Sequence, residues 1–151
     1  MLHKNFYKTH DLYKFHKQNV VYLAYVGKID TQHHYKYGIS TNVFQREYDQ
    51  HRKTFEEFQM CLIKKTHNMH QAEEMLEKEL KIRNLHTQKT ILGKRQTELF
   101  IVNDDFDYMY VQRLVNRIVR HVDKEITDEV KRLRSEIRMR DMEIQRLRAQ
   151  K

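Results

Sequence analysis

The chain contains no proline and only three glycines among its 151 residues. Because these two residue types supply many turn and loop conformations, their scarcity favours helices and strands joined by tight connections over long loops. The length allows one domain with an appendage. A hydrophobic fraction of 39% is enough for a small core.

The composition also excludes several kinds of protein. The single cysteine, Cys61, rules out an internal disulfide and a cysteine-based zinc site. No segment approaches the roughly 20 consecutive apolar residues of a membrane span. The N-terminus lacks the apolar core of a signal peptide. We therefore expect a soluble, intracellular protein in a reducing compartment.

The net charge of +8 is distributed unevenly along the chain. Basic residues are in excess in residues 1–18, 61–103 and 123–151, whereas residues 19–60 and 104–122 are balanced. Such clustering is typical of proteins that bind polyanions, although a simple role in solubility explains the composition equally well.

Residues 19–103 predict an α+β domain with a small central antiparallel sheet flanked by helices. Asn19–Val26 is apolar on both faces, as in a strand at the centre of a sheet. Short polar connections and alternating apolar residues indicate three further strands. These are His34–Ile39, Glu57–Lys64 and Thr97–Val102, the last of which is either a short strand or an extended segment.

Two capping-box spacings predict helix starts in this domain, at Asn42 with Gln45 and at Asn68 with Gln71. The second helix has an apolar stripe formed by Met69, Ala72, Leu76 and Leu80. The polar segment Leu85–Gln96, which includes Gly93, is predicted to be the longest loop.

Residues 1–18 form a leader in which lysines alternate with aromatic residues. Interleaved cations and rings can contact phosphates and stack on bases. The interpretation we favour is a short helix that lays Phe6 and Tyr13 on the domain.

No helix breaker occurs after Asp104, which predicts one long C-terminal helix. Residues 104–122 carry a broad apolar stripe that is expected to pack on the domain. The stripe consists of Val111, Leu114, Val115, Ile118 and Val122.

Residues 123–151 change to a 4-3 apolar pattern, which is typical of a coiled coil. β-branched residues at the a positions with leucine at d favour a parallel homodimer, and Arg140 interrupts the seam. The seam residues are Ile126, Val130, Leu133, Ile137, Ile144 and Leu147. A lone solvated helix is the alternative.

Five polar residues recur near the ends of the predicted elements: Tyr22, Lys36, Arg46, His51 and Glu98. Phosphodiester cleavage needs such a set, because a base must deprotonate water and a cation must stabilise the charge that develops on phosphate. A carboxylate must also hold a divalent metal. Taken singly, each residue also fits a structural role in the core or on the surface.

These residues belong to an ordered series of short motifs that spans residues 19–103. The series comprises Val20-Val21-Tyr22, Lys36-Tyr37-Gly38-Ile39-Ser40-Thr41-Asn42, Arg46, His51, Ala72-Glu73 and Thr97-Glu98-Leu99-Phe100. In this order it resembles the GIY-YIG nuclease superfamily, and specifically the variant branch found in phage and large-DNA-virus proteins. The resemblance implies metal-dependent hydrolysis of DNA by an intracellular, viral protein.

The resemblance also implies roles for the individual residues. Tyr22 would activate the attacking water, Arg46 would stabilise the pentavalent phosphate and His51 would assist proton transfer. Glu98 would bind a single Mg²⁺ or Mn²⁺. Glu73 matches a family position, but the helix pattern predicts a surface charge there.

Two departures from the family pattern bear on the chemistry. Lys36 stands where the family has its second tyrosine, and the strand alternation turns Tyr35 and Tyr37 to the opposite face. The Lys36 ammonium would contact phosphate. His51 follows Arg46 by five residues, so on an ideal α-helix the two side chains would diverge by about 140°.

DNA is therefore the expected partner, and the candidate phosphate contacts are Lys36, Arg52, Lys53, Lys94 and Arg95. Two alternatives to a nuclease remain open. One is an inactive nuclease-like module that binds nucleic acid or acts as a scaffold, which predicts salt-sensitive DNA binding without cleavage. The other is protein–protein assembly through the coiled coil, which predicts no DNA affinity.

Overall fold

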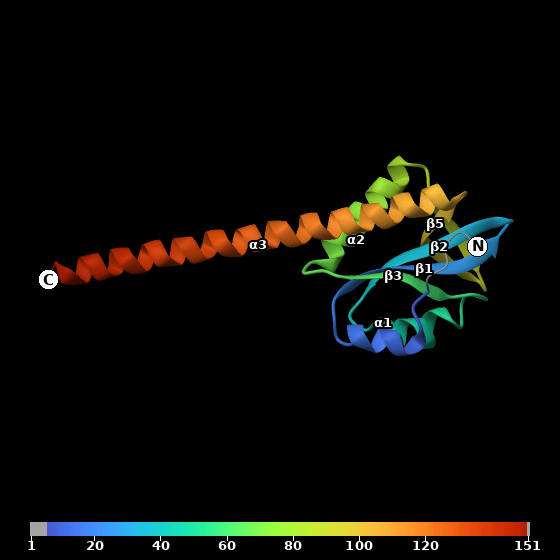
Figure 1. The fold of residues 1–151 in the computed structure, drawn as a ribbon, viewed down its shortest axis with the longest axis horizontal. Coiled ribbons are helices and arrows are strands. Elements are labelled where there is room, and N and C mark those ends of the chain that lie inside the picture. Colours follow the sequence, from blue (N-terminus) through green and yellow to red (C-terminus); the bar gives the residue numbers. More distant parts are fainter. Residues whose placement is uncertain (1–5, 151) are drawn as a thin grey trace.

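A computed structural model describes residues 6–150, apart from the side chains at positions 48, 49, 105 and 106. Residues 1–5 of the predicted leader lie outside this described part. The chain folds into one five-stranded antiparallel sheet flanked by helices, and a long C-terminal helix extends away from it (Figure 1). The predicted α+β class is confirmed.

The sheet has the strand order β3-β1-β2-β5-β4, so that β1 lies inside it, as its apolar sequence predicts. In chain order the elements are η1 (Thr9–Phe15), β1 (Val20–Ile29), β2 (Gln32–Ser40), α1 (Val43–Gln45), η2 (Arg46–His51), β3 (Gln59–Lys65), α2 (Met69–Ile82), β4 (His86–Ile91), β5 (Lys94–Val102) and α3 (Asp105–Ala149).

The predicted loop Leu85–Gln96 is wrong, because this segment forms β4, a turn and the beginning of β5. The turn residues Leu92 and Gly93 have φ angles of 50° and 76°. Two central residues with positive φ define a type I′ hairpin turn. The strand escaped prediction because β4 lies at the sheet edge and contains only one strongly apolar residue, Ile91.

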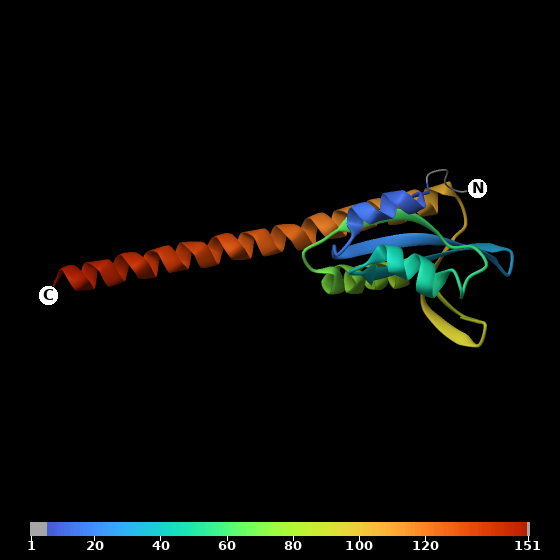
Figure 2. The ribbon, with the colours of Figure 1, turned by 90° about the horizontal axis from the view of Figure 1, so that it is seen from below.

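Helices cover both faces of the sheet, and each face has its own apolar cluster (Figures 1 and 2). On one face α2 and α3 pack against a cluster that includes Tyr35, Tyr37 and Phe100. On the other face η1, α1 and η2 lie over a cluster that includes Tyr22 and Leu99. The sheet therefore separates the two tyrosines of β2 from Tyr22, as the alternation predicts.

The leader packs on the domain through η1, as expected for the short helix. Its anchor is Leu12, which is fully buried, whereas Tyr13 is 59% exposed and stacks on Phe44. Phe6 packs against the cluster beneath α3.

The two parts of α3 have different surroundings. The predicted stripe from Val111 to Val122 is buried against the sheet. Asp123 accepts hydrogen bonds from the Thr66 hydroxyl and the His67 amide, both at 2.9 Å. Gln71 of α2 donates to Glu125 at 3.2 Å, and Ile126, the first of the predicted seam residues, packs partly buried against the domain cluster. Beyond Ile126, α3 extends free of the domain (Figure 1). In the described chain, no helix is both long enough and apolar enough to span a membrane.

Candidate active site

The segment that carries Arg46 and His51 is a π-helix, η2. Its ladder includes the bond from the Arg52 amide to the Glu47 carbonyl, 3.1 Å, which links residues five apart. Because a π-helix closes i→i+5 bonds, residues five apart lie on the same side of it. The expected divergence of Arg46 and His51 is therefore wrong. The wider π-helical turn compensates for the additional residue between them, and the charges of Arg46 and Lys36 both act on His51.

Tyr22 and His51 form the centre of the site. The Tyr22 hydroxyl lies 3.1 Å from His51 Nε2, and both side chains are buried. Burial, followed by the charges of Lys36 and Arg46, lowers the pKa of His51 to about 3, so the imidazole is neutral at physiological pH. Burial likewise raises the pKa of Tyr22 far above its usual value.

Gly38 makes room for the Tyr22 ring. The two residues are cross-strand partners on β1 and β2. A Cβ at position 38 would lie 2.6 Å from the Tyr22 hydroxyl oxygen and 2.8 Å from Cζ. Any side chain there would push the phenol away from His51.

Lys36 is buried and forms an ion pair with Glu98, at 3.2 Å between Nζ and Oε2. The Lys36 side chain is 6% exposed, and that of Glu98 is 39% exposed. Lys36 is therefore only slightly accessible, and its contact with DNA stays a prediction. Its charge instead holds the carboxylate next to the Tyr22–His51 pair and helps to keep His51 neutral.

Glu73 of α2 is a member of the site that the helix pattern missed. It is half-buried, and burial together with the nearby Glu98 carboxylate raises its pKa to about 7. The charges of Lys36 and Arg46 lower the pKa of Glu73. Because the same two cations act on His51, Glu73 belongs to the same site. The sequence contained two indications of this. Glu73 matches a position of the family it resembles, and it lies four residues after Met69 and three before Leu76, beside the apolar stripe.

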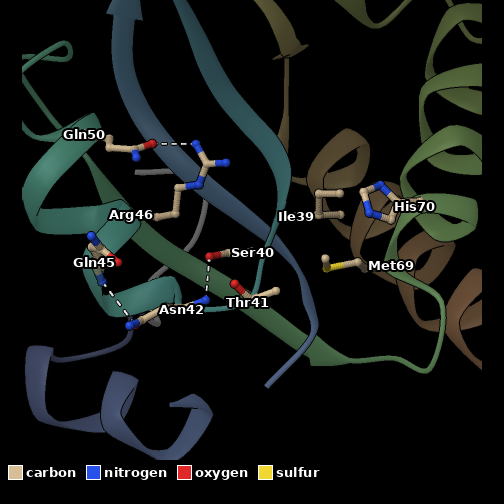
Figure 3. Close-up of a pocket in the computed structure, with 9 residues that line it drawn as sticks. All are labelled: Ile39, Ser40, Thr41, Asn42, Gln45, Arg46, Gln50, Met69 and His70. Carbon is tan, nitrogen blue, oxygen red and sulfur yellow. Dashed lines mark hydrogen bonds between the residues drawn. The ribbon is translucent and has the colours of Figure 1, made fainter. Parts of the chain in front are cut away.

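Arg46 lines an open pocket of about 270 Å³. Figure 3 shows its guanidinium turned toward Gln50, to which it donates a hydrogen bond. The turn after β2 forms another wall, where the Asn42 side chain caps α1 at Gln45, as its capping box predicts.

A second pocket, of about 390 Å³, lies between η2 and the β4–β5 hairpin. It is lined by Gln50, His51, Lys53, Thr54, Leu92, Lys94 and Gln96. Two predicted phosphate contacts, Lys53 and Lys94, thus lie near His51. Arg52 donates to Glu47 at 3.0 Å, and Arg95 donates to Gln88 across the hairpin at 3.0 Å.

Glu98 and Glu73 are the side chains of the site that could hold a divalent metal ion. No group of three or more His, Cys, Asp or Glu side chains among the described residues forms a preassembled metal cage. Mg²⁺ usually takes one or two carboxylates and completes its shell with water and substrate phosphate. Glu98 and Glu73 provide two carboxylates whose mutual repulsion a cation would relieve.

A small antiparallel sheet that brings together a tyrosine–histidine pair, an arginine and two neighbouring carboxylates is the arrangement of a nuclease-like domain. In a comparison with protein-family models, residues 19–123 match the T5orf172 domain. The chain belongs to this family, which is related to the GIY-YIG-like and phage nucleases, and is thus a nuclease-like or DNA-binding module. Comparisons with curated proteins and with solved structures found no match.

Proposed function

We propose that this protein is a metal-dependent DNA endonuclease of the GIY-YIG type, which hydrolyses phosphodiester bonds. The observation that carries the proposal is the buried hydrogen bond between Tyr22 and His51. It lies near the cations Lys36 and Arg46 and the carboxylates Glu73 and Glu98. Base, cation and metal donors are the three requirements of phosphodiester hydrolysis.

The Tyr22–His51 pair supports a proton relay. A free tyrosinate would be costly in this buried position, so Tyr22 does not act as a preformed base. A neutral His51 accepts the phenolic proton at Nε2 while the Tyr22 oxygen takes a proton from the attacking water. The proton thus leaves the water without a charged tyrosine as an intermediate.

The other residues act on phosphate and metal. Arg46 lines an open pocket and can donate two parallel N–H bonds to phosphate oxygens. Glu98 and Glu73 would hold Mg²⁺ or Mn²⁺, and the ion would supply a positive charge that acidifies bound water and stabilises the phosphorane. Lys36 holds Glu98 in place through their ion pair.

The test is the conversion of supercoiled plasmid to nicked circles by the full chain with Mn²⁺ or Mg²⁺. Glu98→Gln and Glu73→Gln are each expected to lower the nicking rate at least about tenfold. Glu74→Gln is the matched control, because Glu74 is the exposed neighbour of Glu73 on α2. Plasmid that stays intact with both metals, or wild-type nicking by Glu98→Gln, would contradict the proposal.

One observation favours a second candidate function, a nuclease-like module that binds DNA without cutting it. The Lys36 ammonium already neutralises the Glu98 carboxylate, the proposed metal ligand. Salt-sensitive binding of duplex DNA by a chain that leaves plasmid uncut with both metals would select this alternative.

For the free part of α3 we propose a parallel homodimer. The predicted seam residues from Val130 onward are 39–60% exposed in the single chain. Apolar residues at heptad spacing on a solvated helix are the signature of a coiled coil whose partner supplies the missing contacts. A second copy of the chain, with the same pattern, is the simplest such partner.

A further inference from the structure

The β4–β5 hairpin has an unusual tip. Leu92 is 78% exposed, the largest exposed fraction among the exposed large hydrophobic side chains of the described residues. It also occupies the first central position of the type I′ turn, with φ of 50°. Asparagine or glycine is preferred there, because a branched side chain is strained at positive φ. Leu92 thus departs from two local preferences, and such departures in natural proteins concentrate at functional sites.

The hairpin is braced in a position that reaches toward the candidate active site. Lys89 forms an ion pair with Asp30 of the β1–β2 turn at 3.2 Å, and Arg95 bonds Gln88 across the two strands. The hairpin projects beyond the rest of the domain in Figure 2. Its tip residues Leu92 and Lys94 line the same pocket as His51.

The charges of this pocket favour a polyanion. Lys53 lines it from the turn after η2 and Lys94 from the hairpin, and its described lining residues include no carboxylate. The segment 86–97 carries three cations, Lys89, Lys94 and Arg95, and no acidic residue. An apolar tip flanked by cations is the arrangement with which DNA-bending proteins insert a wedge between base pairs while lysine and arginine hold the phosphates.

We propose that the β4–β5 hairpin is a DNA wedge. Lys53 and Lys94 bind backbone phosphates next to the one at the active site, and Leu92 enters a groove of duplex DNA and unstacks a base step there. The inference rests on the proposed function for its choice of DNA as the ligand, and it adds a mode of substrate recognition. Flexible pyrimidine–purine steps are the expected targets, because they unstack most easily.

The experiment uses a short duplex in which 2-aminopurine replaces the adenine of its TA steps, since the fluorescence of this base rises when it is unstacked. The full-length chain is expected to raise the fluorescence on binding. Leu92→Asn is expected to abolish this rise while retaining or increasing thermal stability, because asparagine suits the turn better. Ile82→Asn is the matched control, since Ile82 is a 63% exposed aliphatic residue on α2 outside this pocket.

The phosphate contacts have a separate readout. Lys94→Gln is expected to lower the slope of log affinity against log salt by about one. Leu92→Asn should leave that slope unchanged, because Leu92 carries no charge. If the wild type nicks plasmid, Leu92→Asn should nick it about tenfold more slowly, because the variant no longer distorts the DNA next to the active site.

Fluorescence that does not rise with wild type, or rises equally with Leu92→Asn, would overturn the wedge even if plasmid is nicked. Fluorescence that rises with wild type and not with Leu92→Asn would support the wedge even if plasmid stays intact. In that last case the endonuclease proposal alone would fail, so the two proposals fail by different measurements.

Discussion

The charged residues of the domain and those of the free part of α3 are alike in kind and opposite in environment. In the domain, Lys36 forms an ion pair with Glu98, and the Lys36 side chain is only 6% exposed. In the free helix, Arg132 pairs with Glu129 and Glu136, and all three side chains are at least 50% exposed. The exposed contact between Arg132 and Glu129 is the shorter, at 2.6 Å against 3.2 Å for Lys36 and Glu98. The two sites therefore differ in solvation in a way that the distances alone do not indicate.

This difference explains why the candidate chemistry is confined to the domain. Water screens the exposed charges of α3, which weakens their interactions with one another. Around Tyr22 and His51, burial removes that screening, and a neighbouring charge can change the protonation state of a side chain. The neutral state of His51 is the clearest result, because desolvation and two nearby cations act in the same direction.

The largest expected effect that separates the two regions is on the nicking rate. Arg46→Ala is expected to lower it by about 10²–10³-fold, the usual cost of removing one donor to the transition state. Thermal stability should change little, because Arg46 lies at an open pocket. Arg132→Ala, which removes an exposed arginine of α3, is the control and should leave the rate unchanged. Equal rates for Arg46→Ala and wild type would exclude Arg46 from the reaction.

A smaller effect is expected on the free energy of unfolding. Glu98→Gln leaves Lys36 buried without its counter-charge, and the expected loss is about 1–3 kcal/mol. Removing one partner of a fully buried pair costs about 3–5 kcal/mol. The loss is expected to be smaller here because the Glu98 side chain is partly exposed. In urea unfolding, the double variant Lys36→Met, Glu98→Gln should recover most of the loss.

The matched cycle on α3 uses Glu129→Gln and Arg132→Met. Because both side chains are exposed, neither single variant should shift the urea midpoint measurably. A coupling in the α3 pair as large as that of Lys36 and Glu98 would show that solvation does not distinguish the two regions.

Local sequence was sufficient for the elements whose own residues determine their environment. β1 is predictable because it is apolar on both faces, and the packed part of α3 because Val111–Val122 repeats at helical spacing. β4 was not predictable in this way. It lies at the edge, and its pairing partner β5 supplies most of what stabilises it.

The candidate site was predictable in its residue types and not in its geometry. Tyr22, Arg46, His51 and Glu98 could be selected by type, order and resemblance. The π-helix that brings Arg46 and His51 together could not, because His51 is held by Tyr22, a residue 29 positions earlier on another element. Tertiary contacts thus override the α-helical periodicity from which their divergence was predicted.

The pH dependence of stability should reveal His51. Its pKa is lowered from 6.5 to about 3 in the folded chain, so between these values the unfolded chain binds a proton that the folded chain does not. With respect to His51 alone, the protein is therefore most stable above about pH 6.5 and loses stability as the pH falls toward 3. His51→Gln should flatten this acid-side loss of Tm. His121→Gln, which replaces a 54% exposed histidine on α3, should not change the profile.

Glu73 has the opposite sign. Its pKa is raised from 4.5 to about 7, so the folded chain holds the additional proton in this range. The resulting stability is present below pH 4.5 and is lost as the pH rises through 7. Glu73→Gln should remove this loss, and Glu74→Gln should retain it. A profile identical for Glu73→Gln and wild type would mean that Glu73 is as solvated as its neighbour.

The smallest effect on the domain is expected from variants of the coiled-coil seam. Ile137→Asp places a charge at an a position of the proposed homodimer, and sedimentation should show a change from dimer to monomer. The Tm of the domain should stay the same, because the free helix has no packing contacts with the sheet to lose. Met139→Asp is the matched control, since Met139 is 68% exposed and lies off the seam. A monomeric wild type would exclude the coil, and a dimer that survives Ile137→Asp would place the contact on another surface. A lower Tm of the domain in Ile137→Asp would show that the solvated part of α3 stabilises the domain. The two regions would then not be independent of each other.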